Sequence, residues 1–175
     1  MVSQDKRLIN PPKLKLPKQL RGANHLNLNP YSEGSLTIVV EDNLHNEYPD
    51  YIEEPVMLIS EKLKRIVGKY QRNITFNLVV LVERNRRHQE VYYMMGVPEI
   101  DCLVDDIELD AMGNLKDFTL DEAKIGSNRI FRVKGHNKKL IVRLDVAESL
   151  LRRDAAGITF EKLEDEEEFD ANKKN

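Results

Sequence analysis

The sequence predicts an α+β fold made of two related strand–helix–strand halves with a mostly antiparallel sheet. Residues 57–76 run from a short apolar segment, through a charged stretch with helical apolar spacing, to the β-branched and aromatic run Ile74-Thr75-Phe76. Residues 140–160 repeat this order and end in Ile158-Thr159-Phe160. Because such self-similarity indicates a repeated structural unit, we expect two copies of one arrangement.

The size and composition fit one folded unit. The chain has 175 residues, of which 41% are apolar and 33% are charged, and its formal net charge is -3. A chain of this length buries enough surface to fold without disulfides or metals. Its single cysteine, Cys102, cannot form an internal disulfide, and the four histidines lack the paired spacing of metal ligands. We therefore expect neither a metal nor another cofactor.

Two features of the sequence bear on its location. The longest apolar runs, Leu36–Val40 and Leu78–Val82, are far shorter than the ~20 residues that cross a bilayer. The first residues lack the apolar core of a secretory signal. Both observations predict a cytoplasmic protein without membrane contact.

The ends of the chain differ from its middle. Residues 1–31 contain four prolines and four asparagines, which favours an extended arm with little regular structure. The basic residues of this arm lack interleaved aromatics, so a solvated arm is expected rather than a contact with nucleic acid. Residues 164–175 continue a strongly acidic run and are expected to form a disordered tail. The folded domain is therefore expected to span residues 32–163.

The first half should begin with a strand at Leu36–Val40, which is rich in β-branched residues and follows a glycine. A second short strand, Val56–Ile59, leads to Ser60, whose hydroxyl can cap the N-terminus of a helix. The apolar residues on one face of this helix are Leu63, Ile66, Val67 and Tyr70. Next comes the strand Ile74–Glu83, and a further strand begins with residues Val91–Met95. We expect these two strands to pair antiparallel.

The second half should contain a hairpin, a helix and a final strand. Strands are expected at Ile130–Val133 and Leu140–Val142, joined by a turn at residues 135–137. Asp145 is a plausible cap for a helix that continues to Asp154, and Gly157 is expected to end it before the strand Ile158–Phe160. The residues expected to point inward from this helix are Val146, Leu150 and Leu151.

The middle of the chain is acidic. Between Glu99 and Glu122 there are nine carboxylates and a single lysine, around a turn-like segment at residues 110–114. This segment lacks the ligand spacing of a calcium loop and the aromatic platforms of a glycoside hydrolase. It is either a solvated hairpin or a docking surface for a basic partner, because unlike charges speed encounter and fix register. The candidate partner-binding residues are Asp105, Asp106, Glu108, Asp110, Asp121 and Glu122.

Tyrosines could supply anchors for such a partner. Tyr48, Tyr51, Tyr92 and Tyr93 each combine apolar area with a hydroxyl. For the adjacent pair Tyr92 and Tyr93, alternation along a strand favours one ring in the core and one outside.

Motifs for catalysis are lacking in the sequence. It contains no glycine-rich phosphate loop, no serine nucleophile elbow, and no cysteine with an assigned histidine base. No catalytic residue is proposed, and we expect a protein that is not an enzyme.

Four segments together resemble a known bacterial family. They are Pro55 to Leu63, Tyr92 to Val97 closely followed by Ile100-Asp101-Cys102-Leu103, Ile130 to Gly135, and Ala156 to Phe160. In order and spacing they are similar to the immunity-protein family numbered eleven among polymorphic-toxin systems, a former domain of unknown function. The resemblance covers roughly residues 54–163.

This resemblance implies a small cytosolic protein that binds and neutralises a cognate toxin by stoichiometric inhibition, with no direct contact to nucleic acid. The motif residues Ile100, Cys102, Leu103, Phe131 and Phe160 are apolar and are expected in the core. If the toxin acts on nucleic acid, its surface is basic, and the acidic residues named above would approach it in place of phosphates. Two alternatives remain: a small-ligand-binding protein or enzyme with a cleft between the halves, and a module that assembles, for example as a homodimer, through a sheet edge.

Overall fold

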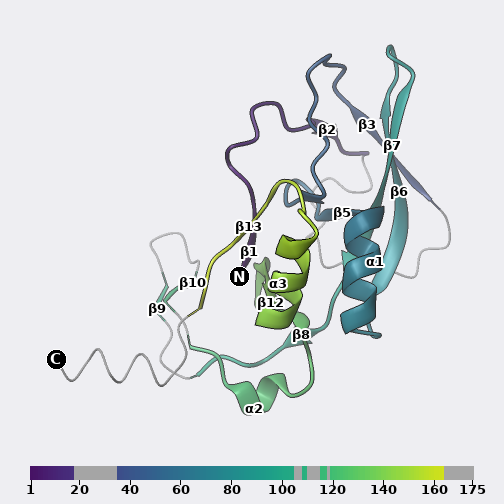
Figure 1. Ribbon diagram of the computed structural model, residues 1–175. Coiled ribbons are helices and arrows are strands. Elements are labelled where there is room, and N and C mark those ends of the chain that lie inside the picture. The colour runs from purple at the N-terminus through teal and green to yellow at the C-terminus, as the bar shows by residue number, and fades with distance from the viewer. Residues whose placement is uncertain (18–34, 105–107, 110–114, 118, 164–175) are drawn as a thin grey trace.

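The computed structural model describes residues 1–17, 35–104, 108–109, 115–117 and 119–163. The described helices are α1 (Glu61–Tyr70), α2 (Glu122–Ile125) and α3 (Leu144–Arg152). Figure 1 shows that α1 and α3 lie side by side, next to the sheets. The fold is α+β with mostly antiparallel sheets, as the sequence predicts. No helix in these ranges is long and apolar enough to cross a membrane.

The strands form two large sheets and one small one. The six-stranded sheet has the order β2 (Leu14–Lys15), β3 (Leu36–Val40), β6 (Thr75–Glu83), β7 (His88–Gly96), β5 (Leu58–Ser60), β4 (Tyr51–Ile52). The five-stranded sheet has the order β13 (Ile158–Phe160), β1 (Val2–Gln4), β12 (His136–Val142), β11 (Ile130–Val133), β8 (Glu99–Ile100). The strands β9 (Glu108–Leu109) and β10 (Leu115–Asp117) pair separately.

Both expected strand–helix–strand units are present as elements. In the first, β5 and β6 flank α1 in sequence, and β7 lies between these strands and is antiparallel to both. In the second, β12 and β13 flank α3, and β1 lies between them, again antiparallel to both. The units therefore share a pairing pattern, although the middle strand follows the unit directly in one case and comes from the start of the chain in the other. That the halves are copies of one another stays a prediction.

The expectation of a loose arm at residues 1–31 is wrong for the part that the structure describes. Val2 in β1 is fully buried and pairs with Leu140 on one side and Phe160 on the other. Leu14–Lys15 forms the edge strand β2 beside β3. The prolines at positions 11, 12 and 17 lie outside these strands, so they interrupt regular structure without preventing it. Residues 18–31 and the predicted tail at 164–175 lie outside the described residues.

One apolar cluster joins the two large sheets. It contains Ile59 and Met95 from the six-stranded sheet, Ile130 and Ile158 from the five-stranded sheet, and buried residues of both long helices. A second cluster lies under β3, β6 and β7. A third surrounds Cys102 and Phe131, with Ile100 and Leu103 packed against it. Because the first cluster draws on both halves, they share one core, and Cys102, Phe131 and their neighbours are core residues as expected.

The helix α1 follows the sequence prediction closely. The Ser60 hydroxyl accepts a hydrogen bond of 3.2 Å from the backbone N–H of Leu63, which is the expected N-cap. Leu63, Ile66 and Val67 are buried, and Tyr70 packs against them.

The helix α3 differs from the prediction at both ends. It begins at Leu144, so Asp145 lies in its first turn rather than at the cap, and it ends at Arg152. Val146, Ser149 and Leu150 are buried, but Leu151 is 60% exposed. At 100° per residue, Leu151 lies well off the buried stripe that the other three residues define.

Replacing Val2 with Ala should lower the free energy of unfolding by about 2 kcal/mol, because buried methyl groups are lost from the middle of a sheet. Urea denaturation monitored by circular dichroism measures the change. Lys6→Ala is the control, since Lys6 is exposed in the same segment, and should change stability by no more than about 0.5 kcal/mol. If both substitutions change the free energy of unfolding by the same small amount, this segment is a loose arm and not part of the core.

Gly157→Ala should lower stability by about 3 kcal/mol or more. Gly157 has φ +72°, and a Cβ there would stand 2.2 Å from Cβ of Pro49, so left-handed strain and a clash combine. Gly135→Ala is the matched control, because Gly135 has φ +79° with open space around it, and should cost only about 1–2 kcal/mol. Thermal or urea denaturation of both variants measures the difference in stability. Similar losses of stability for the two variants would show that Pro49 moves aside at little energetic cost.

Candidate functional site

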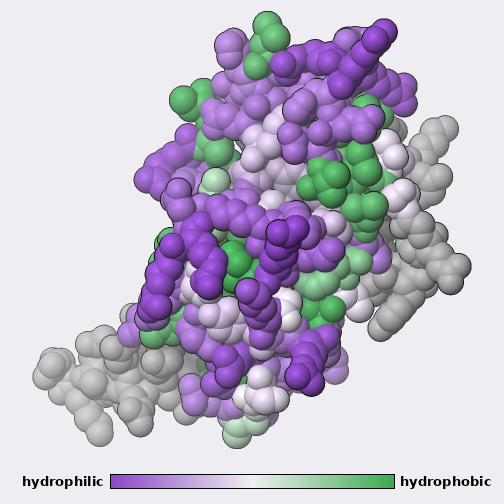
Figure 2. All heavy atoms as spheres, turned by 45° about the vertical axis from the view of Figure 1, so that its right-hand side comes forward, coloured by the Kyte–Doolittle hydropathy of each residue, from purple (hydrophilic) through white to green (hydrophobic). Residues whose placement is uncertain are grey.

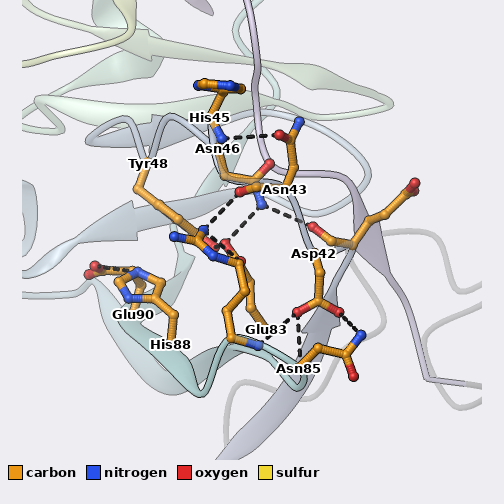
Figure 3. A network of polar contacts seen from close by, with 11 residues as sticks. Asp42, Asn43, His45, Asn46, Tyr48, Glu83, Asn85, His88 and Glu90 are labelled. Atoms are coloured by element: carbon orange, nitrogen blue, oxygen red, sulfur yellow. Dashed lines mark hydrogen bonds and ion pairs between the residues drawn. The ribbon is translucent and has the colours of Figure 1, made fainter.

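The most extensive polar cluster described is centred on Glu83, the last residue of β6 (Figure 3). Its side chain has no exposed surface. The carboxylate accepts hydrogen bonds from the Tyr48 hydroxyl, from Nδ2 of Asn46 at 2.9 Å and from Nη1 of Arg86 at 3.0 Å. The donors come from the loop before β4 and from the turn after β6, so the carboxylate ties this loop to the hairpin tip.

The protonation states in this cluster follow from these contacts. Burial raises the pKa of Glu83, but the hydrogen bonds from Tyr48, Asn46 and Arg86 and the charge of Arg86 outweigh it, so the pKa lies below 4.5. Burial, followed by the hydrogen bond to Glu83, raises the pKa of Tyr48. The carboxylate therefore stays ionised and the phenol stays protonated near neutral pH, and the pair suits holding a loop more than moving a proton.

A second anchor lies beside the first. Asp42 accepts hydrogen bonds from the backbone N–H and Nδ2 of Asn85, both at 3.0 Å, and from the backbone N–H of Arg86 at 3.3 Å. The Tyr48 ring packs against His88, with ring centroids 5.3 Å apart, and Nε2 of His88 lies 3.0 Å from a carboxylate oxygen of Glu90. The hairpin tip is thus held on two sides.

The structure places only part of the predicted acidic surface. Asp105, Asp106 and Asp110 lie outside the described residues, and Glu108 is described only as a residue of β9 that pairs with Asp117. Asp121 caps α2 by accepting from the N–H groups of Ala123 and Lys124, at 2.9 and 3.3 Å. Glu122 is exposed in the first turn of α2.

The described part of this acidic region also carries compensating cations. Nζ of Lys124 lies 3.7 Å from Asp121, and Nζ of Lys134 lies 3.9 Å from Asp101. Asp121 thus has a structural role in the helix and a nearby positive charge. Among the described residues, no group of three His, Cys, Asp or Glu side chains could hold a metal ion.

Two of the four candidate tyrosine anchors are inaccessible. Tyr51 and Tyr92 are buried, and the Tyr92 hydroxyl donates to the carbonyl oxygen of Pro49 at 2.6 Å. Tyr93 points to the opposite face of β7, where Nζ of Lys64 lies 3.6 Å from its ring centroid. The expectation of one ring in the core and one outside is confirmed for the buried Tyr92, but the Tyr93 ring on the opposite face is half-buried and packs against the shared core.

A surface that the sequence reasoning did not single out lies on the six-stranded sheet. We call it the open sheet face, and its apolar residues are Val39, Leu78, Val80, Val82 and Val91. The register places them together, because Val39 pairs with Val82 and Val80 pairs with Val91. Their neighbours in sequence, such as Val79 and Leu81, point to the buried cluster on the other side.

The open sheet face is accessible. Leu78 is 38% exposed and Val91 is 47% exposed, and the other three residues are half-buried. The helix α1 covers only the neighbouring part of this face, where Phe76 and Tyr93 pack against the shared core. Figure 2 brings the side that carries β6 and β7 forward and shows apolar residues gathered there, with hydrophilic residues above them and to their left. The signal in the sequence was the near-continuous apolar run of β6, which leaves both faces of the strand apolar.

Comparison with protein-family models and with curated proteins finds no match to this chain. The resemblance to immunity proteins therefore depends on the four segments named above.

Glu83→Gln tests the role of the buried carboxylate. At pH 7 the variant should be less stable by about 1–3 kcal/mol, because one amide oxygen cannot replace a charged acceptor with three donors. Because folding lowers the pKa of Glu83, its ionised carboxylate contributes to the free energy of unfolding above about pH 4.5. This contribution is lost as the pH falls through the folded-state pKa. The difference in free energy of unfolding between the wild-type protein and the variant, measured by urea denaturation, should therefore be smaller at pH 3 than at pH 7.

Glu90→Gln is the matched control for this experiment. Its side chain is 40% exposed in a surface pair with His88, so the change at pH 7 should be about 0.5 kcal/mol or less. If the difference in free energy of unfolding between wild type and Glu83→Gln stays constant over this pH range, the stabilising role of the ionised Glu83 carboxylate is wrong.

Proposed function

We propose that this protein is a cytosolic immunity protein that binds a cognate bacterial toxin and neutralises it by stoichiometric inhibition. The observation that carries the proposal is the open sheet face, where Leu78 and Val91 are exposed beside three half-buried valines on strands whose other face is buried. Contiguous exposed apolar area with a polar border is typical of surfaces that bind another protein. Inhibition requires only that such a surface cover the toxin tightly.

The arrangement of the four resembling segments supports the proposal. They contribute Ile59 in β5, Met95 in β7, Ile130 in β11 and Ile158 in β13, and these side chains meet in one apolar cluster. Segments that are far apart in the chain and meet in one core are the pattern that a shared fold would leave in related sequences. The resemblance therefore concerns the scaffold, and the binding surface must be sought elsewhere on the molecule.

In the family that this chain resembles, the toxin is encoded beside the immunity protein, so the test is to express this chain with the product of the adjacent gene. We expect the two proteins to co-purify at a one-to-one ratio, which light scattering can measure, and we expect this chain to protect cells that express the toxin. Glu148→Ala, on the exposed side of α3, should protect as well as the wild-type protein. A neighbouring product that is harmless to cells and forms no complex would contradict the proposed function.

A further inference from the structure

We infer that the open sheet face is the surface that contacts the partner, and that the partner presents an apolar patch bordered by carboxylates. This inference depends on the proposed function, since it takes the partner to be the toxin. It differs from the sequence-based hypothesis, in which an acidic surface of this chain meets a basic toxin.

The open sheet face consists mainly of apolar side chains. Val39, Leu78, Val80, Val82 and Val91 form a continuous area across three paired strands, and their neighbours in register are the uncharged Thr37 and Gln89. The strands β3, β6 and β7 are held from behind by a buried cluster that includes Ile38, Val79 and Leu81. The surface is therefore rigid before binding, which lowers the entropic cost of forming a complex.

Exposed cations border the open sheet face beside β3 and at the end of β6. Lys13 and Lys15 are exposed beside β3, and Arg84 is exposed one residue beyond the end of β6. None of these three cations forms an ion pair with a residue in the described ranges. Two carboxylates lie at this end: Glu41, whose backbone N–H bonds to the carbonyl oxygen of Lys13, and Asp42, which accepts hydrogen bonds from Asn85 and Arg86. The three cations Lys13, Lys15 and Arg84 outnumber these two carboxylates.

The border of the open sheet face on the side of α1 also has an excess of positive charge. Lys64 and Arg65 on α1 share the single carboxylate of Glu61, at 3.7 and 2.9 Å, and Lys64 lies over Tyr93 next to Leu78. The open sheet face is thus an apolar surface between two borders with an excess of cations. Carboxylates on a partner complement such a border and suppress partners of positive charge.

This charge pattern decides between possible occupants. A second copy of this chain would bring its own cationic borders against these, which is repulsive. An anionic membrane would fit the charge but not the shape, because surface-binding elements insert Trp, Phe or Leu on a helix, whereas this face consists mainly of short valine side chains on a sheet. A folded protein with a flat apolar patch and acidic residues around it satisfies both conditions.

The experiment measures the dissociation constant of the complex with the adjacent gene product for three variants and two controls. Val91→Glu places a charge at the most exposed position of the face and should raise the constant at least about 100-fold. The double variant Lys15→Glu with Arg84→Glu should slow association about tenfold and weaken its dependence on salt. Thermal denaturation checks that these variants stay folded, and Val91→Ser, which adds no charge, should raise the constant about tenfold if Val91→Glu unfolds.

Two further variants serve as controls. Reversing Asp105, Asp106 and Glu108 together should leave the constant unchanged, and so should Glu148→Ala at an exposed position of α3 outside the open sheet face. A loss of binding in the acidic triple variant with full binding by Val91→Glu would overturn the inference and support the sequence-based surface. Wild-type protein that does not bind the neighbouring product would instead refute the proposed function itself.

The alternative occupants are tested with the same purified proteins. Light scattering of this chain alone should give a monomer, and vesicles of phosphatidylcholine with one quarter phosphatidylserine should not sediment it. A dimer, or vesicle binding, that is abolished by Val91→Glu would assign the face to a second copy or to a membrane and would overturn the inference.

Discussion

The five-stranded sheet depends on the pairing of β1 with two strands from the other end of the sequence. Ser3 and Gln4 pair with Thr159 and Ile158 on one side, and Val2 lies opposite Leu140 on the other. Because β12 and β13 do not pair with each other, removing β1 would leave two strands with unpaired backbone groups and would open the shared core at Val2. The backbone hydrogen bonds of β1 thus hold the final strand, and with it the turn after α3, in place.

Two polar side chains join this sheet to the rest of the molecule. The buried amide of Gln71, at the end of α1, donates to the carbonyl oxygen of Ile130 and accepts from the N–H groups of Ile130 and Arg129, at 2.7–2.8 Å. Asp50, before β4, accepts from the Ser60 hydroxyl and from the N–H of Ala156. Each links one sheet or its helix to the other half, so the two halves are positioned by directional bonds as well as by apolar packing.

This rigid scaffold leaves its most unusual surface on the six-stranded sheet. The helix α1 covers one end of the face that carries Tyr93, and no other helix in the described ranges covers the other end, where Leu78 and Val91 are exposed. At the tip of the same strands, Glu83 and Asp42 tie the loop before β4 to the hairpin turn. The open sheet face therefore lies on elements that are fixed at both ends, as a preformed docking surface requires.

The sequence by itself determined the local structure of this protein. Alternating and clustered apolar residues located β3, β6 and β7, and Ser60 with the spacing of Leu63, Ile66 and Val67 located α1 and its cap, because these signals act between residues close in the chain. Tertiary structure alone decided that Val2 belongs to a sheet and that Glu83 is buried with Asn46 and Tyr48 as donors. These outcomes depend on partners 35 or more residues away, such as Tyr48 for Glu83. The same reason hid the open sheet face, since an apolar strand residue is exposed or buried only according to which element covers it.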